Sequence, residues 1–147
     1  MTIETIPALR GILSHPWLYP ALEVVHIVGI GLLLGSLVLV ELRLWGRAAE
    51  LPVRPLARFG LTLTLAGFAL AAASGSMMFL SQPDELLANR PFLLKMALLL
   101  CVGLNAAVFH LRGGIARHAE GVARGQTLLS LGLWLGIIIC GRSIAYY

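Results

Sequence analysis

Four long apolar segments take up most of this sequence and limit what it can fold into. They lie near residues 21–45, 59–80, 92–111 and 126–146. At about 1.5 Å of rise per residue, a helix over each segment is long enough to cross roughly 30 Å of hydrocarbon. Each segment is apolar on all sides, which separates a membrane helix from a surface helix of a soluble bundle. The sequence therefore predicts an all-α fold, an up-and-down bundle of four membrane helices.

The composition supports a single integral membrane domain in contact with the lipid bilayer. Of the 147 residues, 59% are hydrophobic and only 12% are charged, and the mean hydropathy is +0.88. A soluble domain of this size carries a larger share of charged residues on its surface. The net charge of +4 comes from arginines spread over several loops. Since they form no single basic stripe, we expect no nucleic acid as a partner.

The loops between the segments predict the orientation of the chain in the membrane. The sequences GRAAELPVRPLAR and RGGIARHAEGVARG carry three arginines each, more than the other connections. Basic loops stay in the cytoplasm, so both termini are expected outside. The opening segment TIPALRGILSHPWLYP is short and interrupted by proline. It predicts a short N-terminal interfacial helix that does not span the membrane.

Small residues in the segments predict where helices approach each other closely. In the second segment they recur every three or four positions, and we expect this stripe to face the bundle centre: Gly60, Thr64, Gly67, Ala71, Ser74 and Met78. Two GxxxG pairs are further candidate contacts, Gly31 with Gly35 and Gly132 with Gly136.

Polar side chains inside the apolar segments fall into an outer and an inner layer. The outer layer draws on all four segments and contains Glu23, His26, Ser74, Ser76, Met77, Met78, Lys95 and Arg142. A charged group inside the membrane costs on the order of 2.5 to 3.5 kcal/mol, so such groups are expected to face one another or a cavity.

The inner layer contains Glu41, Arg43, Asn105 and His110. We expect Glu41 to pair with an arginine across this layer, and Arg112 is the candidate.

The outer layer suits a haem, which needs an apolar slot and one or two axial ligands. His26 is the expected iron ligand, while Lys95 and Arg142 suit the two propionates. His110 is excluded as the second ligand, because it differs from His26 in depth by roughly 20 Å. The second ligand is absent or comes from Met77, Met78 or His15.

Two other interpretations of the same residues stay open. In the first, His26 hydrogen-bonds Glu23 or a neighbouring helix, and the charged groups form a structural cluster. In the second, His15, His26 and Met77 or Met78 hold copper. The sequence carries no G-x-S-x-G, P-loop or zinc-protease signature, and whether the protein is an enzyme is left undecided.

Three stretches, LEVVHIVGIGLLLGSLVLVELRLWG, RPFLLKMALLLCVGLN and GRSIAYY, resemble a functionally unassigned family of small bacterial four-span integral membrane proteins. More distantly, the histidine in the first segment, the Leu-Arg exit and the lysine entering the third are similar to HemJ-type protoporphyrinogen oxidases and CopD-type copper-resistance membrane domains. The resemblance implies a location in the bacterial cytoplasmic (inner) membrane, and haem b or copper at the outer layer.

From these observations we expect a small membrane protein that binds a b-type haem in the outer leaflet. His26 would be the metal ligand, with Glu23, Met78, Lys95 and Arg142 completing the site. The protein would pass electrons to or from a redox partner. The alternatives are a non-redox assembly subunit of a membrane complex and a copper-handling module. The electron donor, any substrate and a homo-oligomeric state are left open by the sequence.

Overall fold

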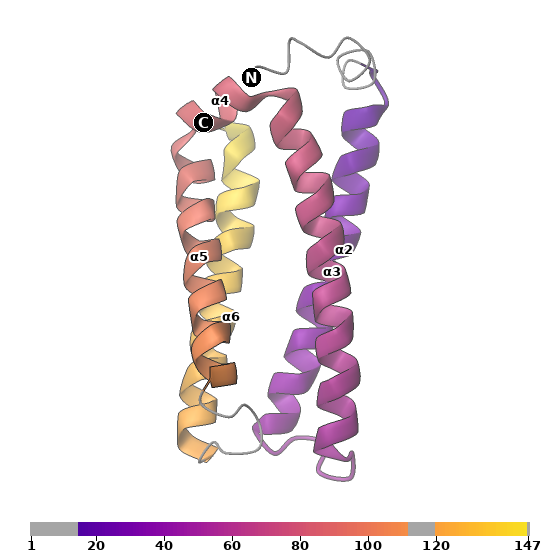
Figure 1. Ribbon diagram of the computed structural model, residues 1–147, viewed down its shortest axis with the longest axis vertical. Coiled ribbons are helices and arrows are strands. Elements are labelled where there is room, and N and C mark those ends of the chain that lie inside the picture. Colours follow the sequence, from indigo (N-terminus) through magenta and orange to yellow (C-terminus); the bar gives the residue numbers. More distant parts are fainter. Residues whose placement is uncertain (1–14, 112–119, 147) are drawn as a thin grey trace.

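The computed structural model describes residues 15–111 and 120–146, and this part of the chain is almost entirely helical. The elements, labelled as in Figure 1, are α2 (Leu18–Leu44), α3 (Val53–Ser81), α4 (Pro83–Ala88), α5 (Arg90–Leu111), α6 (Glu120–Ser143) and the 3-10 turn η3 (Ile144–Tyr146). No strand occurs among the described residues. The predicted all-α bundle of four long helices is confirmed. Of the segment expected to form the N-terminal interfacial helix, residues 5–14 lie outside the described part, and the last three, Leu18 to Pro20, belong to α2.

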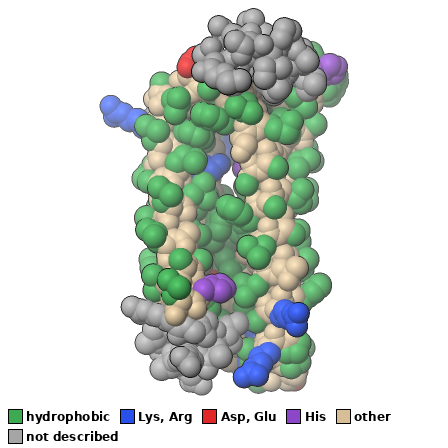
Figure 2. Space-filling view, in the orientation of Figure 1, with side chains coloured by type: hydrophobic (Ala, Val, Ile, Leu, Met, Phe, Trp, Pro, Cys, Tyr) green, Lys and Arg blue, Asp and Glu red, His purple; other side chains and the backbone are tan. Residues whose placement is uncertain are grey.

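Each long helix has the length and composition of a membrane span, and the four together identify a multi-pass membrane protein. Large apolar side chains remain exposed along all four helices, for example Ile27, Leu65, Leu100 and Ile139. In Figure 2 apolar side chains cover most of the visible face between the two ends of the bundle. Such a surface is stable against lipid tails and not against water. The bundle is therefore in contact with the bilayer.

The four helices form two pairs that lie side by side (Figure 1). Helix α2 packs closely along α3, and α5 packs along α6, while α2 and α6 make the main contact between the pairs. The start of α2, the short helix α4 and the end of α6 lie at one end of the bundle, and the α2–α3 connection lies at the other. The chain thus runs up and down.

Close backbone approach holds α2 against α3. A Cβ atom on Gly67 would lie 2.5 Å from the Leu33 amide nitrogen, and one on Gly29 would lie 2.8 Å from the Ala71 nitrogen. Ser36 and Thr64 add a hydrogen bond between their hydroxyl oxygens, 2.8 Å apart. The predicted stripe of small residues in α3 is therefore an interface. It packs against α2 through Gly60, Gly67 and Ala71, and Thr64 also lines the space between the two helix pairs.

The expected GxxxG contact of α2 is wrong. Gly31 and Gly35 are exposed, and a Cβ atom on either would meet nothing within 4 Å. The face of α2 that contacts α3 runs through Gly29, Leu33 and Ser36. Since residues share a helix face at spacings of three or four, a glycine two positions beyond Gly29 points away from that face.

Contact between the two pairs rests on an apolar cluster. Leu33, which is only 1% exposed, packs with the buried side chains of Trp134 and Ile137 from α6. Leu98, Leu99 and Val102 of α5 border this cluster, as do Leu34 and Leu37 of α2. The cluster therefore joins three of the four long helices near mid-height.

Asn89 fixes the start of α5, and its loss should cost measurable stability. Its Oδ1 accepts a hydrogen bond of 3.1 Å from the Phe92 amide, and its Nδ2 donates to the Ile144 carbonyl at 3.1 Å. We expect Asn89→Ala to lower the free energy of unfolding by about 1 to 2 kcal/mol, because helix cap and tie to η3 are lost together. Asn89→Asp should recover part of this loss, since aspartate can still cap the helix. Unfolding in detergent, followed by circular dichroism, would contradict the assignment if Asn89→Ala and the wild type unfolded alike.

Candidate functional site

His26 lies in the first half of α2, which is expected toward the outside, and reaches across to α3. Its Nδ1 atom is 3.1 Å from the Ser74 hydroxyl oxygen, and the imidazole is partly buried. Gly75 leaves room for the ring, because a Cβ atom at that position would lie 3.1 Å from the His26 Cε1 atom. The ring position is therefore set by two small residues of the neighbouring helix.

The hydrogen bonds of Ser74 assign the tautomer of His26. The Ser74 hydroxyl lies 2.7 Å from the Leu70 carbonyl oxygen and 3.3 Å from the Ala71 carbonyl oxygen. A carbonyl can only accept, so the single hydroxyl proton is donated to the backbone. The Ser74 oxygen then accepts from His26 Nδ1–H. This arrangement leaves Nε2 with its lone pair, as in histidines that bind metals through Nε2.

Lys95 of α5 brings a positive charge into this region. Its ammonium is close enough to act electrostatically on His26 and on Cys140 of α6. A Cβ atom on Gly141 would lie 3.8 Å from the Lys95 Nζ atom, so the side chain turns inward against α6. In Figure 2 a lysine or arginine and a histidine are visible inside the hollow between the two helix pairs, near the outer end. Two of the expected outer-layer residues are thus brought together.

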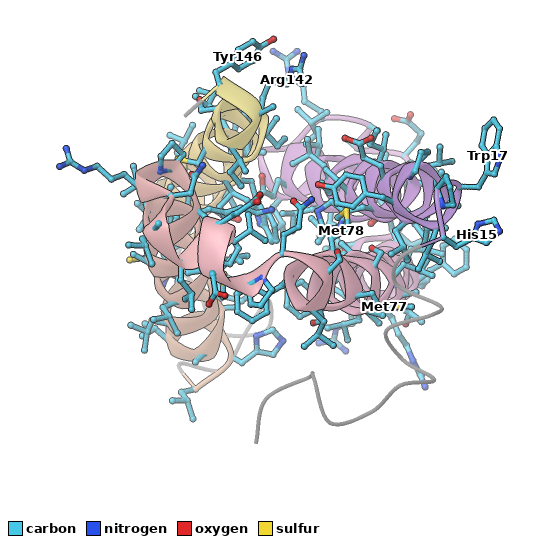
Figure 3. The ribbon with its side chains drawn as sticks, turned by 90° about the horizontal axis from the view of Figure 1, so that it is seen from above. His15, Trp17, Met77, Met78, Arg142 and Tyr146 are labelled. Carbon is cyan, nitrogen blue, oxygen red and sulfur yellow. The ribbon has the colours of Figure 1, made fainter. Side chains whose placement is uncertain are left out.

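The remaining residues of the predicted site lie elsewhere. Arg142 points away from the bundle, where it donates a hydrogen bond of 2.9 Å to the Tyr146 hydroxyl and stacks 5.2 Å from that ring (Figure 3). Glu23 is exposed on α2. Met78 is partly buried and points toward α2, whereas Met77 points outward. The single layer of charges expected from the sequence is therefore split, with His26 and Lys95 inside and Arg142 outside.

A metal site built only from side-chain ligands has little support in the described residues. Among residues 15–111 and 120–146, no group of three His, Cys, Asp or Glu side chains is placed to hold an ion. His15 is exposed and points away from the bundle at the start of α2 (Figure 3). His26 with Met78 is the remaining combination for copper.

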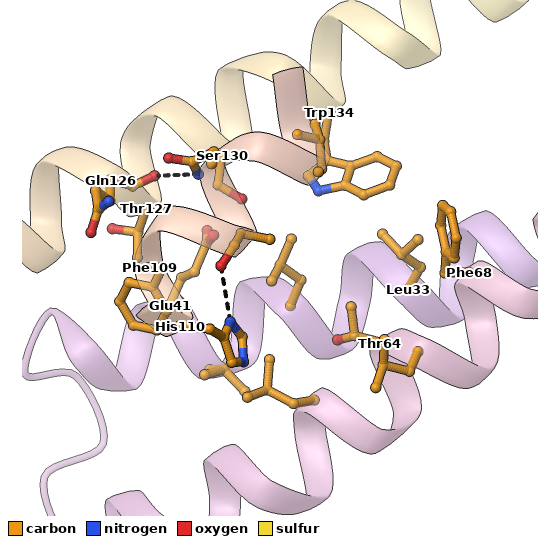
Figure 4. Close-up of a pocket in the computed structure, with 18 of the residues that line it drawn as sticks. Leu33, Glu41, Thr64, Phe68, Phe109, His110, Gln126, Thr127, Ser130 and Trp134 are labelled. Atoms are coloured by element: carbon orange, nitrogen blue, oxygen red, sulfur yellow. Dashed lines mark hydrogen bonds between the residues drawn. The ribbon is translucent and has the colours of Figure 1, made fainter. Parts of the chain in front are cut away.

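The half of the bundle nearer the α2–α3 connection, which is expected to be the inner half, contains a cavity of about 380 Å³ between the two helix pairs (Figure 4). All four long helices line it, mostly with leucine, valine and aromatic side chains. Most of its polar groups gather at one end, among them Glu41, Asn105, Gln126 and Ser130, while Thr64 lies toward the other end (Figure 4). The cavity therefore combines an apolar body with a polar end, the form that most small-molecule sites share.

Glu41 is the most buried ionisable side chain of the described part, at 3% exposure. The Ser130 hydroxyl forms a hydrogen bond with its carboxyl group. The Oε2 atom has no hydrogen-bond partner among the described residues. Arg43, its nearest arginine along the chain, instead donates to the Leu51 and Ala49 carbonyls at 2.7 and 3.1 Å. The expected partner Arg112 lies outside the described residues.

Sequence reasoning missed this cavity, although one signal was available. Glu41 follows Leu33 by eight positions and Leu37 by four, so it continues the interior face of α2. An acidic residue on the interior face of an apolar helix marks a functional site more often than a surface charge does.

Comparison of the chain with protein-family models, with curated proteins and with solved structures found no match.

Proposed function

We propose that this protein binds one b-type haem through His26 and passes electrons to or from a redox partner. It would do so in the bacterial inner membrane, with both chain ends and the haem toward the outside. The observation that carries the proposal is the hydrogen bond between His26 Nδ1 and the Ser74 hydroxyl, from which we assign the proton to Nδ1 and the lone pair to Nε2. An iron ligand needs a neutral imidazole nitrogen that is held in one orientation.

The residues around His26 fit a haem in three respects. Ser74 orients the imidazole, Gly75 leaves it space, and the ammonium of Lys95 is placed for a charge-assisted contact with a propionate. Arg142 would take part only from the rim, because its guanidinium is occupied by Tyr146. When bound, the haem would supply one-electron redox chemistry. The protein itself would bind the iron through His26 Nε2 and shield the site with apolar helices. Lys95 would balance the negative charge of a propionate.

A structural role for the same residues has one observation in its favour. The His26–Ser74 bond joins α2 to α3, so it also contributes to helix association. In this second interpretation the protein is a subunit of a larger membrane complex and carries no cofactor.

The absorption spectrum of the purified protein tests the haem proposal. We expect a Soret band, sharpened α and β bands after reduction with dithionite, and close to one haem per chain by pyridine haemochrome assay. A haem precursor is added to the growth medium during overproduction, so that the supply of haem in the cell does not limit its incorporation. Protein that remains colourless under these conditions would overturn the proposal and favour the structural role.

A further inference from the structure

The cavity in the inner half of the bundle is short of hydrogen-bond donors. Glu41 Oε2 and Gln126 Oε1 are both buried, both belong to residues that line the cavity, and neither has a partner among the described residues. The side-chain amide of Asn105 also lines the cavity, and it donates to the backbone carbonyl oxygen of Gln126 at 3.4 Å. A buried acceptor without a donor is costly, and more so when it belongs to a carboxylate, as the Oε2 atom of Glu41 does. A molecule that brings donors would remove this cost.

The walls of the cavity favour a positive charge on that molecule. Phe68, Phe109 and Trp134 line it from three different helices (Figure 4). Aromatic faces attract cations, and Glu41 adds a full negative charge when ionised. No lysine or arginine is among the described residues that line the cavity. Among the described lining residues, only His110 could become cationic and offer an anion a counter-charge, whereas a neutral molecule would leave an ionised Glu41 without an opposite charge.

The cavity is also accessible from the lipid. Leu65 and Gly103 line it and are themselves exposed on the lipid-facing surface. A ligand that partitions into the bilayer can enter sideways between α3 and α5 without crossing the loops.

We propose that this cavity binds a lipophilic organic cation, namely a protonated amine with a compact apolar body. Its ammonium group donates to Glu41 Oε2 and Gln126 Oε1, and its apolar body lies among the leucines and aromatic rings. The proposal is independent of the haem, because the cavity lies in the other half of the bundle and shares no residue with the His26 site.

Two probes that share one apolar cage and differ only in the polar group test whether the ammonium group is required. 1-Adamantylammonium carries a positive charge and three N–H donors, while 1-adamantanol carries the same cage with a neutral hydroxyl. Binding of tritiated probes would be measured by equilibrium dialysis against the protein in phosphatidylcholine nanodiscs, with empty nanodiscs subtracted. We expect saturable binding of the ammonium near one per chain, and much weaker binding of the alcohol. Equal binding of both, or binding of neither, would overturn the proposal.

Two matched pairs of variants locate the site. Glu41→Gln should weaken binding of the ammonium about thirty-fold or more, because one partner of a buried charge pair is removed. Glu50→Gln, an identical change in the exposed α2–α3 connection, should leave binding unchanged. Gly103→Leu should also reduce binding by filling the cavity, and Gly132→Leu should not. A Cβ atom at either glycine meets nothing within 4 Å, so both proteins should fold. Wild-type binding in Glu41→Gln, or in Gly103→Leu, would refute this site.

Discussion

Replacing Gly67 by leucine is expected to separate α2 from α3 and to lower the free energy of unfolding by about 3 kcal/mol. A Cβ atom on Gly67 would lie 2.5 Å from the Leu33 amide nitrogen and 2.7 Å from the Gly29 carbonyl oxygen. Both neighbours are backbone atoms of a regular helix, and neither can move without shifting all of α2. In lipid no hydrophobic drive brings helices together, so the contacts made by close backbone approach are not easily replaced.

Glycines on the lipid-facing side of α2 provide the control for this prediction. Gly31→Leu and Gly35→Leu add the same side chain where nothing lies within 4 Å, and each should change stability by less than about 0.5 kcal/mol. Unfolding of detergent-solubilised protein with increasing sodium dodecyl sulfate, followed by tryptophan fluorescence, measures the difference. Equal stability of Gly67→Leu and Gly31→Leu would show that the α2–α3 interface differs from the one described above.

The number of long helices could be predicted because it depends on local properties, whereas α3 and α6 each begin six residues before the predicted start. An apolar run of about twenty residues can be recognised without knowledge of its neighbours. The choice of contact face could be predicted for α3, where small residues recur through Gly60, Gly67 and Ser74. It could not be predicted for α2, which has glycines on two faces. Whether Gly29 or Gly31 contacts α3 depends on the rotation of α2 about its axis relative to α3. This rotation is set by the packing of both helices together.

For the residues of the candidate site, the depth in the membrane could be predicted from the sequence. The side of the helix to which each side chain points could not. Depth follows from residue count, so His26 and Lys95 were placed at similar levels and do lie near each other. Direction around a helix is less certain near its end, where a long side chain can reach outward. Arg142 lies two positions beyond the buried Cys140, and two positions turn a helix by about 200°. Tyr146, one turn later, then offers Arg142 a partner outside the bundle.

Removal of the His26 imidazole should have the largest effect on the proposed cofactor. We expect His26→Ala to be isolated with little or no haem, because Nε2 of this residue is the proposed iron ligand. Ser74→Ala keeps the ligand but loses the acceptor that orients it, and haem affinity should fall by about 10- to 100-fold. His110→Ala is the matched control. This histidine lies in the inner half of the bundle, and its Nδ1 donates to the Ala106 carbonyl of its own helix at 3.0 Å.

Stability measured on the same proteins separates the haem from the structural interpretation. The haem proposal requires a graded loss of Soret absorbance from wild type through Ser74→Ala to His26→Ala, with the helical content of all three unchanged. The structural role requires a colourless wild-type protein. It also requires that the free energy of unfolding falls in both variants, because each of them loses the hydrogen bond between His26 and Ser74. Full haem content in His26→Ala would contradict ligation by this residue, because no other described histidine lies near Ser74 and Lys95 in the outer half of the bundle.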